Sequence, residues 1–183
     1  MSLAQDSQHA LVVIDVQQGF DDSVWGRRDN PACEANIASL IEAWSVAGRP
    51  IVIVRHDSTS PGSPLRSGQP GNDLRPGIAG DVLITKSVNS AFYGDPDLQA
   101  WLTERGITRL TICGVTTNHC CETTARMAGN LGYDVTFVID ATHTFDRVGP
   151  DGSVIPAEEI ARVTAANLHG EFATVMAAED VLA

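Results

Sequence analysis

The chain has 183 residues, a length typical of one domain with a sizeable hydrophobic core. Its formal net charge of -11 at pH 7, without any cluster of lysine and arginine, argues against binding to nucleic acid. Hydrophobic residues make up 43% of the chain, but no apolar run approaches the roughly 20 residues of a membrane span. We therefore expect one globular domain, residues 1–183, that binds neither nucleic acid nor membrane.

The opening segment, residues 1–15, has no basic stretch followed by an apolar stretch and a small-residue cleavage site, so we expect a cytoplasmic protein. In that compartment the even number of four cysteines does not indicate disulfides. Cys33 and Cys113 stand among apolar neighbours, which predicts buried and unreactive thiols.

Short apolar runs rich in Val, Ile and Leu alternate with helix-like segments along the chain. Such continuous apolar runs are typical of parallel strands that are covered on both faces. The pattern therefore predicts an α/β sandwich. The expected strands are Ala10–Asp15, Pro50–His56, Asp81–Lys86, Arg109–Val115, Tyr133–Asp140 and Phe172–Ala177.

Three helices are marked by start and stop signals, in which Asn or Asp before Pro, or Pro alone, opens the helix and Gly follows its end. Trp44 and Trp101 fall on the apolar stripes of the first two helices, which predicts core positions for both. The signals are Asn30-Pro31 with Gly48, Asp95-Pro96 with Gly106, and Pro156, at the start of the expected last helix, with Gly170.

Residues 58–80 interrupt the alternation with a long segment that holds four of the nine prolines and no helical periodicity. A loop of this length in a compact domain is usually functional. Its apolar residues Leu65, Leu74 and Ile78 indicate a lid or a contact in a homo-oligomer, either a dimer or a tetramer. The alternative is a mobile, solvated insertion.

Three reactive side chains follow the apolar strands. Asp15 ends the first strand, Lys86 ends the third, and Cys120 lies just beyond the fourth, at the start of a helix-like segment. In parallel α/β sheets ligands bind at the carboxyl ends of the strands. Each residue alone has an ordinary structural explanation, but together they supply a thiol, a base and a cation that can activate the thiol.

Three motifs resemble the signature blocks of the isochorismatase-like cysteine hydrolase superfamily: DVQQGF at 15–20, TKSVNSAF at 85–92 and GVTTNHC at 114–120. The resemblance covers nearly the whole chain. It implies a three-layer, Rossmann-like α/β/α sandwich with a six-stranded, mainly parallel sheet. The superfamily includes nicotinamidases and N-carbamoylsarcosine amidase, so the resemblance also implies a small-molecule substrate and an Asp15, Lys86 and Cys120 catalytic triad.

The resemblance implies an acyl-transfer mechanism. Asp15 would take the thiol proton, Lys86 would stabilise the thiolate, and Cys120 would attack a carbonyl carbon. The backbone amides of Thr116 and Cys120 would form the oxyanion hole, after a cis peptide bond between Val115 and Thr116. Water would then hydrolyse the thioester.

The adjacent Cys121 is expected to pack in the interior, because it lies about 100° further round the helix than Cys120. A disulfide between the two is disfavoured, since neighbouring Cα atoms about 3.8 Å apart are closer than the usual span of a disulfide.

Nicotinamidases of this superfamily add a metal site after the second strand, formed by an Asp and two His. Here that position reads Arg55-His56-Asp57, without a second His in the following loop. We therefore expect no catalytic metal and no cofactor, and we expect His56 and Asp57 at the rim of the pocket. Nicotinamide is accordingly a poor substrate candidate.

Further pocket candidates stand next to the three reactive residues. His143 could reach the same edge, but a solvated loop position is the favoured interpretation. The candidate pocket residues are Phe20, His56, Asn89, Phe92 and His119.

Three functions are compatible with the sequence. The favoured one is a cysteine amidohydrolase that acts on a small amide or ureido compound. The second is an isochorismatase-type vinyl-ether hydrolase, in which Asp15 would be essential and Cys120 dispensable. The third is a binding protein without turnover, which the intact triad disfavours.

Overall fold

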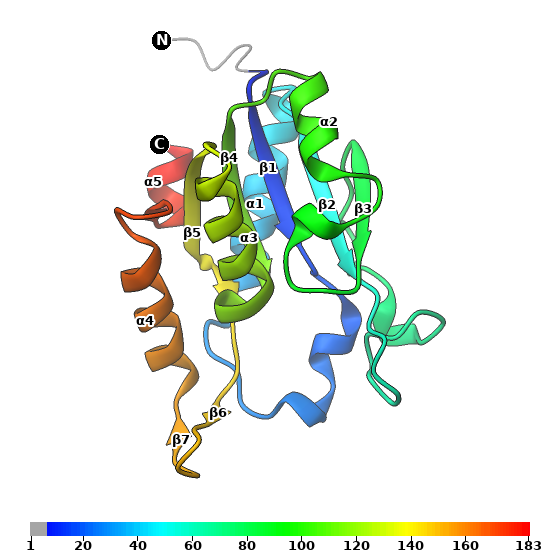
Figure 1. The fold of residues 1–183 in the computed structure, drawn as a ribbon, viewed down its shortest axis with the longest axis vertical. Coiled ribbons are helices and arrows are strands. Elements are labelled where there is room, and N and C mark those ends of the chain that lie inside the picture. The colour runs from blue at the N-terminus through cyan, green and yellow to red at the C-terminus, as the bar shows by residue number, and fades with distance from the viewer. Residues whose placement is uncertain (1–6) are drawn as a thin grey trace.

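Six parallel strands form the central sheet of the computed structural model, which describes residues 7–183 (Figure 1). The strand order is β3-β2-β1-β4-β5-β8. After β3 the chain crosses to the other side of β1 and forms β4, so the strand order reverses between β1 and β4. Ligands bind at such a switch point in open α/β sheets.

All six strands expected from the sequence are present, and two differ in length by more than one residue. β5 extends to His143, three residues beyond the expected end at Asp140, whereas β8 has only three residues. The strands are β1 (His9–Ile14), β2 (Ile51–His56), β3 (Val82–Lys86), β4 (Arg109–Val115), β5 (Asp134–His143) and β8 (Thr174–Met176).

Helices cover both faces of the sheet. Side chains alternate across a strand, so Val12 and Ile14 of β1 pack on one face with α2, α3 and α4, and Leu11 and Val13 pack on the other with α1 and α5. Figure 1 shows α3 in front of the sheet and α1 behind it. The helices are α1 (Cys33–Val46), α2 (Leu98–Glu104), α3 (Glu122–Asn130), α4 (Ala157–Leu168) and α5 (Ala178–Leu182).

Two helix starts differ from the sequence prediction. The first helix begins at Cys33, and the Asn30 side chain instead donates hydrogen bonds to the carbonyls of Asp140 and Thr142. The second helix is capped by Asp97, whose carboxylate accepts a hydrogen bond from the Ala100 N–H, and not by Asp95. Tertiary contacts of Asn30 thus decide where the first helix begins, and the nearby Asp97 decides where the second begins.

The helix after Pro156, α4, is as predicted at its start but is not the last helix, because α5 follows β8. Trp44 is 2% exposed and packs on the face of the sheet that α1 covers. Trp101 is partly buried and packs against the core on the opposite face, which α2, α3 and α4 cover. Both predicted core positions are confirmed.

A short antiparallel hairpin, β6 (Arg147–Val148) and β7 (Val154–Ile155), extends beyond the end of the sheet (Figure 1). Its base is fastened by Arg27, whose guanidinium donates to the carboxylates of Asp146 and Glu158. The base of the hairpin therefore lies next to the carboxyl end of β5, which ends at His143.

Residues 58–80 contain only a 3-10 turn, Pro70–Asn72, yet they are tied to the domain. The amide of Asn72 donates to the carbonyls of His56 and Leu65 and to the Asp57 carboxylate. Leu65, Leu74 and Ile78 pack inside the chain against two core clusters. This packing disfavours the mobile, solvated insertion.

Within residues 7–183, no helix has the length and apolar character that a membrane span requires.

Candidate active site

Three polar side chains meet at the carboxyl edge of the sheet. Asp15 directly follows β1, Lys86 is the last residue of β3, and Cys120 lies in the π-helical turn Thr117–Cys121 between β4 and α3. Because parallel strands end at the same edge, residues that are far apart in the sequence become neighbours here. The structure thus brings the three predicted residues together.

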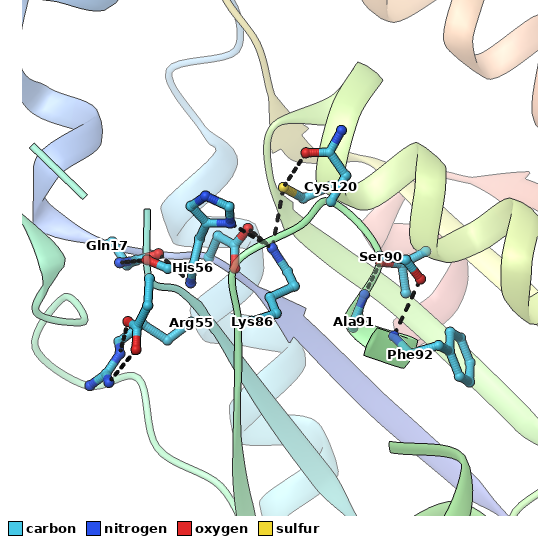
Figure 2. A network of polar contacts seen from close by, with 12 residues as sticks. Gln17, Arg55, His56, Lys86, Ser90, Ala91, Phe92 and Cys120 are labelled. Carbon is cyan, nitrogen blue, oxygen red and sulfur yellow. Dashed lines mark hydrogen bonds and ion pairs between the residues drawn. The ribbon is translucent and has the colours of Figure 1, made fainter. Parts of the chain in front are cut away.

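The ammonium group of Lys86 is the centre of this cluster (Figure 2). Its Nζ lies 2.7 Å from Oδ2 of Asp15, 3.3 Å from Sγ of Cys120 and 3.3 Å from Nδ1 of His56. The side chains of Lys86 and Asp15 are both 0% exposed. Lys86 therefore does not extend into solvent, and its charge acts in a poorly screened environment.

The second carboxylate oxygen of Asp15 is free to accept a proton. Oδ1 of Asp15 is buried and has no hydrogen-bond partner among the described residues. A carboxylate oxygen of Asp15, a ring nitrogen of His56 and Sγ of Cys120 all lie within 4.8 Å of one another. A thiol and an unoccupied proton acceptor thus share one buried site.

Burial and the paired charges set the protonation states of the cluster. Burial opposes the charged form of Lys86, but the Asp15 carboxylate and the hydrogen bonds to Asp15 and Cys120 outweigh it and raise the pKa of Lys86. Burial and the Asp15 charge raise the pKa of Cys120, while Lys86 lowers it. Lys86 therefore keeps its positive charge, and burial makes loss of the Cys120 thiol proton less favourable.

The sequence analysis expects Asp15 to take the thiol proton and Lys86 to stabilise the thiolate, and both groups lie beside the Cys120 sulfur in the structure. The neighbouring His56 stays neutral, because burial and the Lys86 charge lower its pKa.

The other three cysteines are shielded from reagents. Cys33, Cys113 and Cys121 are 0% exposed, whereas Cys120 is 8% exposed, and all four are free thiols. Burial raises the pKa of each shielded thiol. Cys121 packs in the core next to α3, and the adjacent pair forms no disulfide, as the sequence predicts.

A cavity of about 110 Å³ opens onto the Cys120 sulfur. Four of the predicted pocket residues, Phe20, His56, Asn89 and His119, line it, and Asn89 Oδ1 lies 3.8 Å from the sulfur. The remaining lining residues are Asp15, Trp25, Leu65, Thr116, Cys120 and Arg147.

The chain matches the family model described as isochorismatase domain over residues 9–180. This match covers nearly all of the chain and includes the three motifs that supply Asp15, Lys86 and Cys120. The chain belongs to the isochorismatase family.

Relatives of known sequence or structure agree with the family assignment. The isochorismatase family protein YrdC of Bacillus subtilis is 36% identical over 180 residues, covering 97% of this chain and 96% of its own. Nicotinamidase 3 of Arabidopsis thaliana is 32% identical over 153 residues, covering 75% and 74%. A crystal structure of an isochorismatase-family hydrolase from Chromobacterium violaceum is 39% identical, with a TM-score of 0.90, covering 100% and 96%. The protein is accordingly a hydrolase with the isochorismatase-like fold.

Two expectations about the surroundings of this isochorismatase-family site are wrong. Phe92 does not line the cavity; its ring packs against Tyr133 in the hydrophobic core, apart from Cys120 (Figure 2). His143 is not a solvated loop residue, since it ends β5 and is 0% exposed. The longer β5 places the His143 ring in T-shaped contacts with the rings of Phe20 and Phe145.

Three cavity residues have no signal in the sequence motifs. Trp25 ends the 3-10 turn Ser23–Trp25, Leu65 comes from the loop 58–80, and Arg147 comes from the β6 strand of the hairpin. Trp25 and Phe20 have ring centroids 5.2 Å apart and form an aromatic wall with Phe145. The loop 58–80 thus contributes a side chain to the cavity through Leu65.

The residues after β2 do not fit the metal site of nicotinamidases. The Asp57 carboxylate accepts hydrogen bonds from Arg55 and Asn72, and Asp57 does not line the cavity, contrary to the rim position expected for it. His56 Nδ1 faces the ammonium group of Lys86. A metal ion bound between Asp15, His56 and Cys120 would meet this like charge directly.

The peptide bond between Val115 and Thr116 is cis, as the resemblance implies. Thr116 lines the cavity beside Cys120. The two residues expected to form the oxyanion hole, Thr116 and Cys120, therefore line the same small cavity.

Proposed function

We propose that this isochorismatase-family hydrolase is a cysteine hydrolase that cleaves a C–N bond in a small amide or ureido compound. The observation that carries the proposal is the buried Lys86 ammonium group, which contacts both the Asp15 carboxylate and the Cys120 sulfur. A relative whose name is nicotinamidase supports hydrolysis of an amide as the reaction class.

In the first half of the reaction, Oδ1 of Asp15 takes the thiol proton as the Cys120 sulfur attacks the carbonyl carbon. Lys86 offsets the negative charge that forms in the buried site. The carbonyl oxygen becomes an oxyanion, for which we assign the backbone N–H groups of Thr116 and Cys120 as donors. Asp15 then returns the proton to the nitrogen, the C–N bond breaks, and an amine or ammonia leaves.

In the second half, water attacks the thioester carbonyl and gives its proton to Asp15. The C–S bond breaks, the acid product leaves, and the proton returns to the Cys120 sulfur. In the net reaction, one amide and one water molecule give one acid and one molecule of amine or ammonia.

The test is release of ammonia from a panel of small carboxamides and ureido compounds by the wild type, Cys120→Ser and Cys121→Ala. We expect turnover to fall by about 1,000-fold or more in Cys120→Ser, since the nucleophile is replaced by an unactivated hydroxyl. Cys121→Ala is the matched control and should keep the activity, because Cys121 lies in the core.

Mass mapping after brief treatment with iodoacetamide gives a second readout. We expect label on Cys120 before Cys33, Cys113 or Cys121. Wild-type turnover by Cys120→Ser would contradict the proposal. A protein that turns over no amide would also contradict it. In that case, cleavage of a vinyl ether by the wild type and Cys120→Ser, but not by Asp15→Asn, would favour the vinyl-ether hydrolase, and turnover of neither substrate class would favour the binding protein.

A further inference from the structure

Arg147 is the cavity residue that the proposed reaction does not use. It comes from β6, and its side chain lines the cavity that opens onto Cys120. Its Nη2 lies 2.7 Å and 3.2 Å from the two ring nitrogens of His119, the residue next to the nucleophile. Its Nε is buried and has no hydrogen-bond partner among the described residues.

No carboxylate neutralises this guanidinium. Arg147 forms no ion pair with a carboxylate within residues 7–183, whereas Arg27 and Arg28 each pair with a glutamate through two nitrogens. The adjacent Asp146 is engaged by Arg27 and by the Ala157 N–H. Burial alone lowers the pKa of Arg147, with no acidic group opposing that effect.

The cavity therefore carries one uncompensated positive charge. The Asp15 charge is matched by Lys86 at 2.7 Å, and His56 and His119 are neutral at pH 7, since burial and a nearby cation lower the pKa of each. A partly buried, unpaired guanidinium with a free Nε–H is costly unless an anion completes the site. Its planar array of donors matches a carboxylate.

We propose that Arg147 binds the carboxylate of the substrate, so that the enzyme acts on short amido or ureido acids that carry one negative charge. This inference rests on the proposed C–N hydrolase function for the reacting end of the molecule. The cavity of about 110 Å³ restricts the substrate to a small one. His119 holds the guanidinium in place through Nη2, and the guanidinium has no carboxylate partner within residues 7–183, so its charge is available to the substrate carboxylate.

The first experiment compares substrates that differ only at the remote group. Malonamate and succinamate each have one amide and one carboxylate, and malonamide and succinamide replace that carboxylate with a neutral amide. We expect the wild type to favour the acids by about tenfold or more in kcat/KM, as for a hydrogen bond between charged groups. In Arg147→Gln most of this preference for the acids should disappear, mainly because KM for the acids rises. Arg147→Lys should recover part of the preference.

The second experiment does not depend on amide turnover. Iodoacetate and iodoacetamide both alkylate a thiol, forming a C–S bond as iodide leaves, but only iodoacetate carries a carboxylate. We expect the ratio of their rates at Cys120 to exceed the ratio for a free thiol such as glutathione. In Arg147→Gln that ratio should fall by about tenfold, with partial recovery in Arg147→Lys.

Arg162→Gln is the matched control, because it removes the same charge from an exposed position on α4. It should leave unchanged both the acid to diamide ratio in kcat/KM and the iodoacetate to iodoacetamide ratio. Thermal melting checks that each variant is folded. A folded Arg147→Gln that keeps the wild-type iodoacetate to iodoacetamide ratio overturns the inference, whether or not amides are hydrolysed. An Arg147-dependent preference for iodoacetate without amide hydrolysis supports the anion site and contradicts only the proposed reaction.

Discussion

At the residue scale, the cluster of Asp15, Lys86 and Cys120 depends on mutual compensation. The Lys86 and Asp15 side chains are both completely buried, and a buried ion pair is maintained only if both partners are present. The same pair of charges acts on the Cys120 thiol in opposite directions, since Asp15 raises its pKa and Lys86 lowers it. Removing either charge therefore has a distinct, measurable effect on the thiol.

We predict that Asp15→Asn and Lys86→Met both lower amide hydrolysis, by about 100-fold or more, but change alkylation of Cys120 in opposite directions. Asp15→Asn leaves Lys86 as the only charge near the thiol, so its pKa falls and iodoacetamide reacts faster at pH 7. Lys86→Met leaves Asp15 unpaired, so the pKa of Cys120 rises further and alkylation slows. The measurement is the pH profile of the alkylation rate.

The double variant Asp15→Asn with Lys86→Met is the control for folding. Lys86→Met alone should lose about 3–5 kcal/mol of unfolding free energy, because it strands a buried carboxylate, and the double variant should recover much of it. A Lys86→Met protein with wild-type turnover and an unchanged alkylation profile would show that Lys86 has no part in the chemistry.

The buried His143 should make the protein less stable in acid. Burial and the Arg28 charge lower its pKa from 6.5 to about 4. The unfolded state then binds a proton that the folded state does not bind between pH 6.5 and about 4, so stability is complete above pH 6.5 and falls as the pH decreases through that window.

We expect His143 to account for a loss on the order of 3 kcal/mol in unfolding free energy on going from pH 7 to pH 4. His143→Phe keeps a ring next to Phe20 and Phe145 but cannot titrate, so its loss over this range should be smaller. Denaturant unfolding at a series of pH values measures the loss of unfolding free energy in the wild type and in His143→Phe. Parallel curves for the wild type and the variant would count against this explanation.

At the scale of elements, the close approach of β1 and β4 aligns the strand ends that carry Asp15 and Thr116. Gly114 of β4 pairs with Ile14 of β1 and has φ +126°, and a Cβ at this position would lie 2.0 Å from the Ile14 carbonyl oxygen. Only glycine permits this contact, since the backbone of a central strand cannot move aside.

We predict that Gly114→Ala severely destabilises the domain and lowers its catalytic activity. Gly132→Ala is the matched control, because Gly132 also has a positive φ, +90°, but has open space where the Cβ would lie. The control should cost about 1–2 kcal/mol from backbone strain alone. Chemical denaturation should show a loss at least twice as large for Gly114→Ala, and equal losses would contradict the packing argument.

The residues after β2 lead to a prediction about metals. The Asp57 carboxylate is bound by Arg55 and Asn72, and the Lys86 ammonium group lies beside His56. We therefore expect dialysis against a chelator to leave the activity intact. Stoichiometric zinc or iron in the purified protein, together with loss of activity when it is removed, would contradict this expectation.

At the scale of the whole molecule, the homo-oligomer stays a prediction. The sequence argument rested on Leu65, Leu74 and Ile78. Leu65 is buried in the chain, whereas Leu74 and Ile78 are partly buried against a core cluster. Light scattering at micromolar concentration is the direct measurement, and we expect a dimer or a tetramer, whereas a monomer would end this prediction.

The sequence by itself determined the sheet and the three residues at its edge. The apolar runs and their order specify parallel strands, and Asp15, Lys86 and Cys120 follow directly from where those runs end. This worked because a strand boundary and the residue after it are local features of the chain. The same locality explains the correct separation of Cys120 from the buried Cys121.

Only the tertiary structure decided which other side chains complete the cavity. Trp25, Leu65 and Arg147 come from segments without helical or strand periodicity, and they reach the cavity because Arg27 and Asn72 fasten those segments to the domain. Phe92 and His143 were misjudged for the same reason, since their orientation depends on packing against α3 and on the full length of β5. Contacts between distant segments are set by packing and charge pairing in the folded chain, which local patterns in the sequence do not encode.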